Sequence, residues 1–122
     1  MLRHYIEIPI NIINIEGDGF HLIAEGMINN KPARFVVDTG ASRTVFDKDR
    51  ILNYIDNPEF NEKEGISAGI GGTDLSSFIF NIEELSFGDL KINDYQAVAM
   101  DLSNVNNSYA MLKLPPVDGV LG

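Results

Sequence analysis

The chain has 122 residues and 44% hydrophobic residues, which suits one globular domain over residues 1–122 and leaves no room for a second. Its 18 acidic residues outnumber 9 Lys and Arg, and the net charge of −9 would repel a phosphate backbone, so we expect no nucleic-acid partner. Without cysteine or a long apolar run, the sequence predicts no disulfide and no membrane segment, and we expect a cytoplasmic protein.

The first part of the chain has the pattern of strands joined by short turns. Isoleucines at every second position over Ile6–Ile12 predict a strand with one buried face, and Pro9 places that strand at a sheet edge or at a bulge. Residues 17–19 are a turn signal, and residues 20–28 form a second extended segment. The pair Asn29-Asn30 predicts another tight turn, because asparagine tolerates a positive φ. This meander offers no βαβ unit for a dinucleotide.

A third strand, Phe35 to Val37, ends abruptly at Asp38. Because β-branched and aromatic residues suit a buried strand, the Asp38 carboxylate should leave the sheet at the end of an apolar wall. Gly40 permits a tight turn there, and backbone N–H groups or a second carboxyl group could satisfy the acid. A strand-to-turn junction without chemistry would favour the same residues.

The middle of the chain predicts a short helix. Asp47 is a candidate cap for a helix over residues 48–55, with Ile51, Leu52 and Ile55 turned inward. Residues 57–64 are polar and predict an exposed loop.

A glycine-rich segment follows, with three glycines among the four residues 69–72, and it precedes a β-prone run over residues 75–82. The pattern predicts a hairpin whose tip is mobile or lies close to another backbone, because glycine costs backbone entropy. A phosphate-binding loop is excluded because no Gly-Lys-Ser or Gly-Lys-Thr follows. A plain glycine turn remains an alternative.

The last part of the chain predicts two short strands over residues 84–102 around a Gly88-Asp89 turn, with Val98 and Met100 inside, and a polar loop over residues 103–108.

The other acids and the histidines are interpreted as surface residues without a catalytic or metal-binding role. The pairs Asp47 with Asp49 and Glu83 with Glu84 are expected on solvated faces rather than at a metal, and His4 and His21 are expected at the surface.

Three motifs occur in a fixed order: Val36-Val37-Asp38-Thr39-Gly40-Ala41, the tip Gly69-Ile70-Gly71-Gly72, and Val120-Leu121-Gly122. Together they resemble the retropepsin-like aspartic proteases. The resemblance implies an all-β fold, a closed β-barrel with a glycine-rich flap hairpin and one short helix. Such domains normally continue past the last glycine into a helix and a final strand, so it also raises the expectation of a C-terminally truncated domain.

The resemblance implies an aspartic endopeptidase that hydrolyses peptide bonds with water activated between two Asp38 carboxyl groups of a homodimer, without a metal or cofactor. Thr39 would hydrogen-bond to the partner loop, and Gly40 would leave room for the substrate backbone. The implied substrate-binding residues are Ala41, Ser42, Arg43, Gly69, Ile70, Gly71 and Gly72. The implied support for the catalytic loop is Val120, Leu121 and Gly122.

Two other interpretations stay open. The same fold could serve as a peptide-binding or dimerisation module without turnover, since an apolar cleft binds an extended peptide by strand addition whether or not cleavage follows. The other open interpretation is an antiparallel β-domain of unrelated function. An intact Asp38-Thr39-Gly40 favours the enzyme, because a binding module has no need of a costly, partly buried acid.

Overall fold

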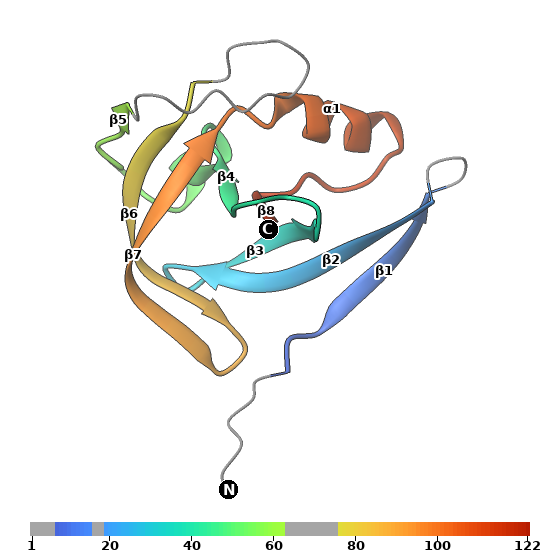
Figure 1. Ribbon diagram of the computed structural model, residues 1–122, viewed down its shortest axis with the longest axis horizontal. Helices are drawn as coiled ribbons and strands as arrows, with labels where there is room; N and C mark the ends of the chain where they lie inside the picture. Colours follow the sequence, from blue (N-terminus) through green and yellow to red (C-terminus); the bar gives the residue numbers. More distant parts are fainter. Residues whose placement is uncertain (1–6, 16–18, 63–75) are drawn as a thin grey trace, which may run out of the picture.

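The computed structural model describes residues 7–15, 19–62 and 76–122 (Figure 1). The predicted flap tip, Gly69 to Gly72, lies outside these ranges. In chain order the elements are β1 (Ile10–Ile15), β2 (Gly19–Ile28), β3 (Lys31–Val37), β4 (Val45–Asp47), the 3-10 helix η1 (Arg50–Asn53), β5 (Asn61–Glu62), β6 (Phe78–Phe87), β7 (Leu90–Met100), α1 (Ser103–Met111) and β8 (Gly119–Leu121).

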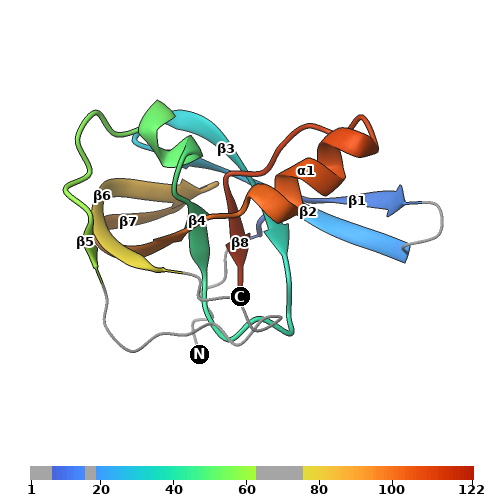
Figure 2. The same ribbon diagram turned by 90° about the horizontal axis from the view of Figure 1, so that it is seen from above.

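The strands of the described residues form one sheet in the order β1-β2-β3-β8-β4-β7-β6-β5. β2 also pairs with β6, through Met27↔Ser86 and Ile28↔Leu85, so the strands from β2 to β6 close into a barrel. β1 and β5 stay outside the closed part, and Figure 2 shows the β1–β2 hairpin extending away from it. This architecture, with its single α-helix among the described residues, confirms the predicted all-β closed barrel.

The turn between β2 and β3 confirms the prediction from its two asparagines. Asn29 and Asn30 have φ values of 50° and 65°, in the left-handed region that asparagine tolerates. The Asn29 N–H donates to the Glu84 carbonyl over 2.8 Å, and the Asn29 side-chain oxygen accepts from the Glu84 N–H over 3.1 Å. The turn is thereby attached to β6, at the place where the barrel closes.

Aromatic rings fill the barrel and fix β3. The Phe35 ring on β3 meets the Phe46 ring edge-on at 5.7 Å between centroids and the Phe87 ring at 5.3 Å, and Phe46 meets Phe80 at 5.8 Å. Each such pair contributes roughly 1 kcal/mol beyond its area burial. Because Phe35 is fully buried, the strand that ends at Asp38 is held firmly along its length.

The first strand differs from its prediction. Ile10 and Ile12 are 47% and 67% exposed, so the predicted buried face is wrong for them. The reason is topological, because β1 pairs with β2 alone and extends past the barrel, whereas Ile13, on the opposite face, packs against a second apolar cluster. The edge position indicated by Pro9 is confirmed.

The predicted helix over residues 48–55 is shorter and tighter. It is the single 3-10 turn η1, in which Ile51 is buried but Leu52 is 52% exposed, so the inward orientation predicted for Leu52 is wrong. Asp47 does accept a hydrogen bond from the Arg50 N–H over 3.1 Å, as a capping residue would.

The second half contains more regular structure than predicted. The polar segment expected as a loop over residues 103–108 belongs to α1, and residues 61–62 of the expected loop over 57–64 form β5 on β6. The strands around the Gly88 turn, β6 and β7, are 10 and 11 residues long rather than short.

Candidate active site

Asp38 follows directly on the last residue of β3, and its position is fixed by backbone contacts. Its N–H donates to the Leu121 carbonyl of β8 over 2.9 Å, and its carbonyl accepts from the Ala41 N–H over 3.0 Å. The Gly40 N–H donates to Asp38 Oδ1 over 3.0 Å. The turn therefore closes on the acid and orients its carboxylate, which is exposed in this single chain.

The C-terminal triplet lies against this turn. β8 runs parallel to β3, with Val36 opposite Val120 and Val37 opposite Leu121, and antiparallel to β4. Beyond β8, the Gly122 N–H donates to the Thr44 hydroxyl over 3.2 Å. A Cβ at Gly122 would lie 2.5 Å from the Arg43 carbonyl oxygen, so only glycine permits this approach.

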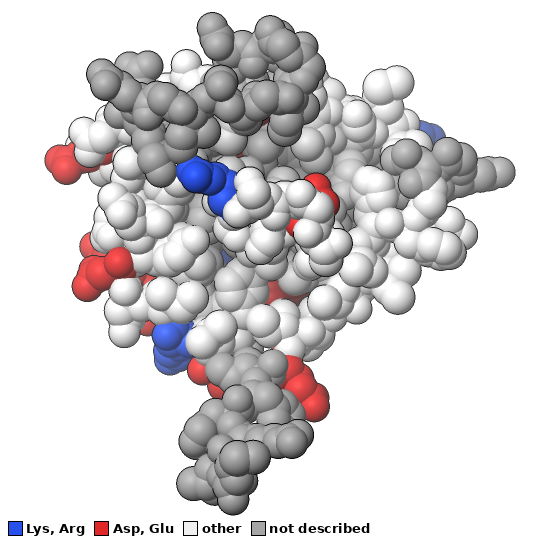
Figure 3. Space-filling model, viewed as in Figure 1, with Lys and Arg blue, Asp and Glu red and all other residues white. Residues whose placement is uncertain are grey.

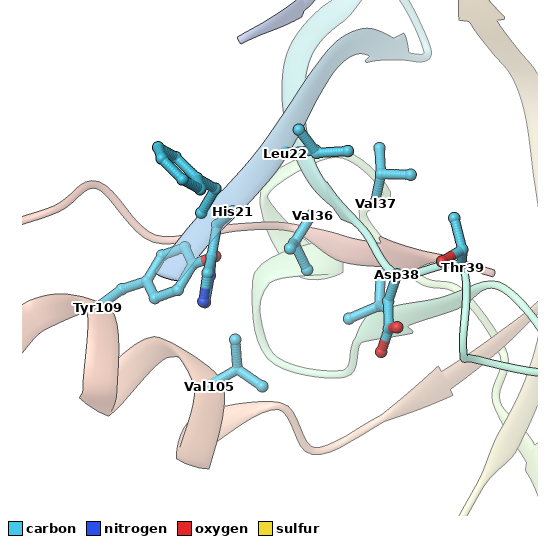
Figure 4. Close-up of a pocket in the computed structure, with 10 residues that line it drawn as sticks. His21, Leu22, Val36, Val37, Asp38, Thr39, Val105 and Tyr109 are labelled. Carbon is cyan, nitrogen blue, oxygen red and sulfur yellow. The ribbon is translucent and has the colours of Figure 1, made fainter. Parts of the chain in front are cut away.

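A pocket of about 480 Å³ opens beside Asp38 (Figure 4). Asp38 and Thr39 contribute to its wall, and Asp38 is the only acid among the described residues that line it. The described residues that line it are Phe20, His21, Leu22, Val36, Val37, Asp38, Thr39, Val105, Tyr109 and Val120. A carboxylate at the edge of a largely apolar pocket is the arrangement expected for acid–base chemistry on a bound organic substrate.

The other residues assigned from the sequence lie around this pocket without all lining it. Gly40, Ser42 and Arg43 are exposed and Ala41 is half-buried, and none of these four belongs to the pocket wall. Val120 does line it, next to the acid. The four residues of the predicted flap tip fall outside the described part of the chain.

His21 and Tyr109 belong to the site although sequence reasoning assigned them nothing. His21 was expected at the surface, but its Nδ1 lies 2.7 Å from the Tyr109 hydroxyl in the pocket wall. The pair joins β2 to α1, and α1 itself was not predicted. Its composition conceals the helix, because Ser and Asn favour caps and turns over helix interiors.

A second group of polar residues lies at the other end of β3. Asp118 is 3% exposed, and its two carboxylate oxygens accept from the Arg34 N–H and from Arg50 Nε, each over 2.8 Å. Asp47, expected on a solvated face, is also buried and accepts from the Leu102 N–H over 2.9 Å. Burial, reinforced by the Asp118 charge, raises the pKa of Tyr54 to about 12.

Charge is dispersed over the face of the molecule that Figure 3 shows. Figure 3 shows acidic and basic side chains scattered over a mostly uncharged face, with no continuous basic area among the described residues visible there. Within the described ranges no three metal-ligating side chains gather, and none of the helices there is long and apolar enough to cross a bilayer.

Comparison with known proteins identifies the family. Residues 24–122 match the aspartyl protease family, a span that includes the Asp38 turn and the C-terminal triplet. The structure resembles the crystal structure of a retropepsin-like aspartic protease from Rickettsia conorii, with a TM-score of 0.53, 18% identity, and coverage of 100% of this chain and 81% of that one. No curated protein sequence matches. The chain therefore belongs to the aspartyl protease family and has the retropepsin-like fold.

Proposed function

We propose that the protein is an aspartic endopeptidase that works as a homodimer. Cleaving a peptide bond without a metal or a covalent intermediate requires one group to take a proton from water and another to give one to the carbonyl. Two carboxyl groups held close together do both, because they keep one proton between them, as is well established for aspartic proteases in general.

The observation that carries the proposal is the way Asp38 is held. Its backbone is tied to Leu121 and its carboxylate receives the Gly40 N–H, so the acid is oriented before any substrate arrives. An exposed aspartate without a task would not need a strand from the far end of the sequence to fix it.

The same geometry favours a dimer. Within the described part of this chain, the pocket wall contains one acid, whereas the mechanism needs two. A symmetric pair of chains that meet at their Asp38 turns supplies the second. In this arrangement Thr39 contacts the partner's turn, Gly40 leaves room for the substrate backbone, and Ala41, Ser42, Arg43 and the segment Gly69 to Gly72 contact the peptide.

The test is cleavage of a diverse peptide mixture between roughly pH 4 and 7, the range in which a shared-proton pair operates, by wild type and by Asp38→Asn. We expect cleavage by wild type alone. Sedimentation at several concentrations should show that activity follows the dimer, and a protein that stays monomeric while cleaving would contradict the dimer.

The second candidate is a peptide-binding module. The observation that favours it is the exposure of Asp38 in the single chain, because an exposed acid lacks the burial cost that favoured the enzyme. The pocket would hold a peptide side chain whether or not hydrolysis follows. Binding of the same peptides by wild type and Asp38→Asn alike, with no cleavage by either, would support the module.

A further inference from the structure

The helix α1 contributes one wall of the Asp38 pocket. Val105 and Tyr109 of α1 line the pocket, and Figure 4 shows the Val105 side chain pointing from the helix toward Val36 on β3. Val105 is half-buried and packs, like Val36, against an apolar cluster that includes Tyr109 and Val117. The space beside Asp38 therefore depends on where α1 lies.

The composition of α1 does not determine that position. Five of its nine residues are Ser or Asn, which favour caps and turns over helix interiors. Such a helix depends on tertiary contacts for its stability and its placement. In its second half, the Tyr109 hydroxyl lies 2.7 Å from His21 Nδ1 on β2. The turn that carries Val105 is anchored elsewhere.

Asn106 provides this anchor. Its side-chain oxygen accepts from the Val117 N–H over 2.8 Å, and its side-chain nitrogen donates to the Val117 carbonyl over 3.1 Å. Val117 is fully buried, so both of its backbone groups need partners inside the protein. Pro115 and Pro116, which precede it, have no N–H to donate. Figure 1 and Figure 2 both show this segment returning beside α1 to β8.

The same anchor leaves the acid itself in place. β8 carries Val120, which lines the pocket, and Leu121, whose carbonyl accepts from the Asp38 N–H. This strand is held by its ladders with β3 and β4 and by the hydrogen bonds of Asp118, just before it. Loss of the Asn106 bonds should therefore move α1 rather than β8, and change the pocket wall rather than the orientation of Asp38.

We infer that Asn106 is a positioning residue that holds Val105 in the wall of the Asp38 pocket and sets how strongly the pocket distinguishes large from small side chains. This inference rests on the proposed function, because the side chain in question is the one beside the bond that Asp38 hydrolyses. In an apolar pocket, one methylene group changes kcat/KM roughly tenfold or more. A fixed wall keeps this discrimination, whereas a wall that moves loses contact with the larger side chain.

The test is competition between two peptides that differ only beside the cleaved bond, with phenylalanine in one and alanine in the other. Competition gives the ratio of the two kcat/KM values, which does not depend on the amount of folded enzyme. For wild type we expect a phenylalanine preference on the order of a hundredfold. Asn106→Ala should lower this preference about tenfold, mainly through a higher KM for the phenylalanine peptide.

The matched control is Asn107→Ala, the same substitution at the next residue of α1, whose side chain is exposed. This variant should keep the wild-type preference. If Asn106→Ala slowed cleavage of both peptides by the same factor, Asn106 would be merely structural and the inference would be wrong. A wild type that does not distinguish the peptides, or an equal fall in Asn107→Ala, would also overturn it.

Two further variants test the route through Val105. Asn106→Asp keeps an acceptor for the Val117 N–H and removes the donor, so its preference should lie between those of wild type and Asn106→Ala, and it carries the test if Asn106→Ala does not fold. Val105→Ala should lower the preference directly. Adding Asn106→Ala to Val105→Ala should then lower it little further, since the anchor acts through Val105. A full additional loss would contradict the inference.

A binding measurement separates this inference from the proposed function. Binding of the phenylalanine and alanine peptides to Asp38→Asn, followed by fluorescence anisotropy, needs no turnover. A phenylalanine preference that Asn106→Ala lowers and Asn107→Ala keeps, each combined with Asp38→Asn, would support the positioning role even if wild type cleaved nothing. Cleavage that depends on Asp38, together with the same preference in all variants, would leave the protease and overturn the role of Asn106.

Discussion

Asp38 and Asp118 lie at opposite ends of the same parallel strand pair, β3 and β8, and their surroundings differ sharply. Asp118 is 3% exposed, and both of its carboxylate oxygens accept short hydrogen bonds. Asp38 is exposed, and within the described part of the chain its carboxylate receives the Gly40 N–H. A carboxylate whose oxygens are both engaged holds structure together, whereas one that is oriented but still accessible can exchange protons with a substrate.

The most direct way to break this comparison is to remove each of the two carboxylates in turn. Asp38→Asn should lower peptide cleavage on the order of 10²- to 10⁴-fold, because it removes the group that exchanges protons. The free energy of unfolding should change by less than about 0.5 kcal/mol, since the site is exposed. Cleavage assays and urea titrations on the same preparations measure both. Full cleavage by Asp38→Asn would end the distinction between the two acids.

Removing the buried acid should mainly lower the free energy of unfolding. Asp118→Ala leaves Arg50 Nε and the Arg34 N–H without their acceptor, and we expect a loss of about 3 kcal/mol in the free energy of unfolding. Asp49→Ala, an exposed acid on the adjoining turn, is the matched control and should change stability by less than about 0.5 kcal/mol. Similar urea midpoints for the two variants would show that the Asp118 contacts carry little stability.

The comparison can be sharpened at the glycine that borders the Asp38 turn. Gly122→Ala places a Cβ 2.5 Å from the Arg43 carbonyl oxygen, so the turn must shift, and cleavage should fall roughly tenfold to a hundredfold. Gly26→Ala provides an equally severe clash, 2.6 Å from the Ser86 carbonyl oxygen, but on the barrel wall. It should cost stability without a selective effect on cleavage per folded molecule. Equal losses of cleavage in both variants would contradict a specific role for Gly122.

The smallest expected effect concerns Tyr54, near the buried acid. Its hydroxyl donates to the Pro32 carbonyl over 2.8 Å, and Tyr54→Phe should cost about 1 kcal/mol. Because the pKa of Tyr54 is raised from 10.0 to about 12, its contribution is fully present below pH 10 and is lost as the pH rises from 10 to about 12.

Ultraviolet titration of phenolate formation measures this shift directly. In Tyr54→Phe the ionisation contributed by Tyr54 should be missing, while the other three tyrosines of the chain are retained. An unchanged titration curve above pH 10 would show that Tyr54 ionises normally.

Local chemistry made several features of the first three strands predictable. The Asn29-Asn30 turn, the apolar run ending at Asp38 and the edge position marked by Pro9 each depend on residues close together in the chain. The contact between Val120-Leu121-Gly122 and the Asp38 turn was expected through the resemblance to a family, since no local signal places a C-terminal triplet beside residue 38.

The features that were missed depend on distant partners. α1 contains Ser and Asn where a helix former would be expected, and it is stabilised by Tyr109, packed against Ile23, and by the hydrogen bonds of Asn106 to Val117. The same dependence concealed His21, whose partner Tyr109 is 88 residues away. A single sequence carries no local pattern for such pairs.

The central position of β8 sets the order in which the molecule can assemble. The strand lies between β3 and β4, yet Asp118, just before it, bonds to a residue 84 positions earlier. During synthesis the β2–β3 hairpin can form early, but the sheet stays open between β3 and β4 until residues 119–121 have left the ribosome. Contacts of such long sequence separation slow folding. The nascent chain therefore acquires the backbone hydrogen bond that fixes the Asp38 turn only when β8 arrives, because the acceptor is the Leu121 carbonyl.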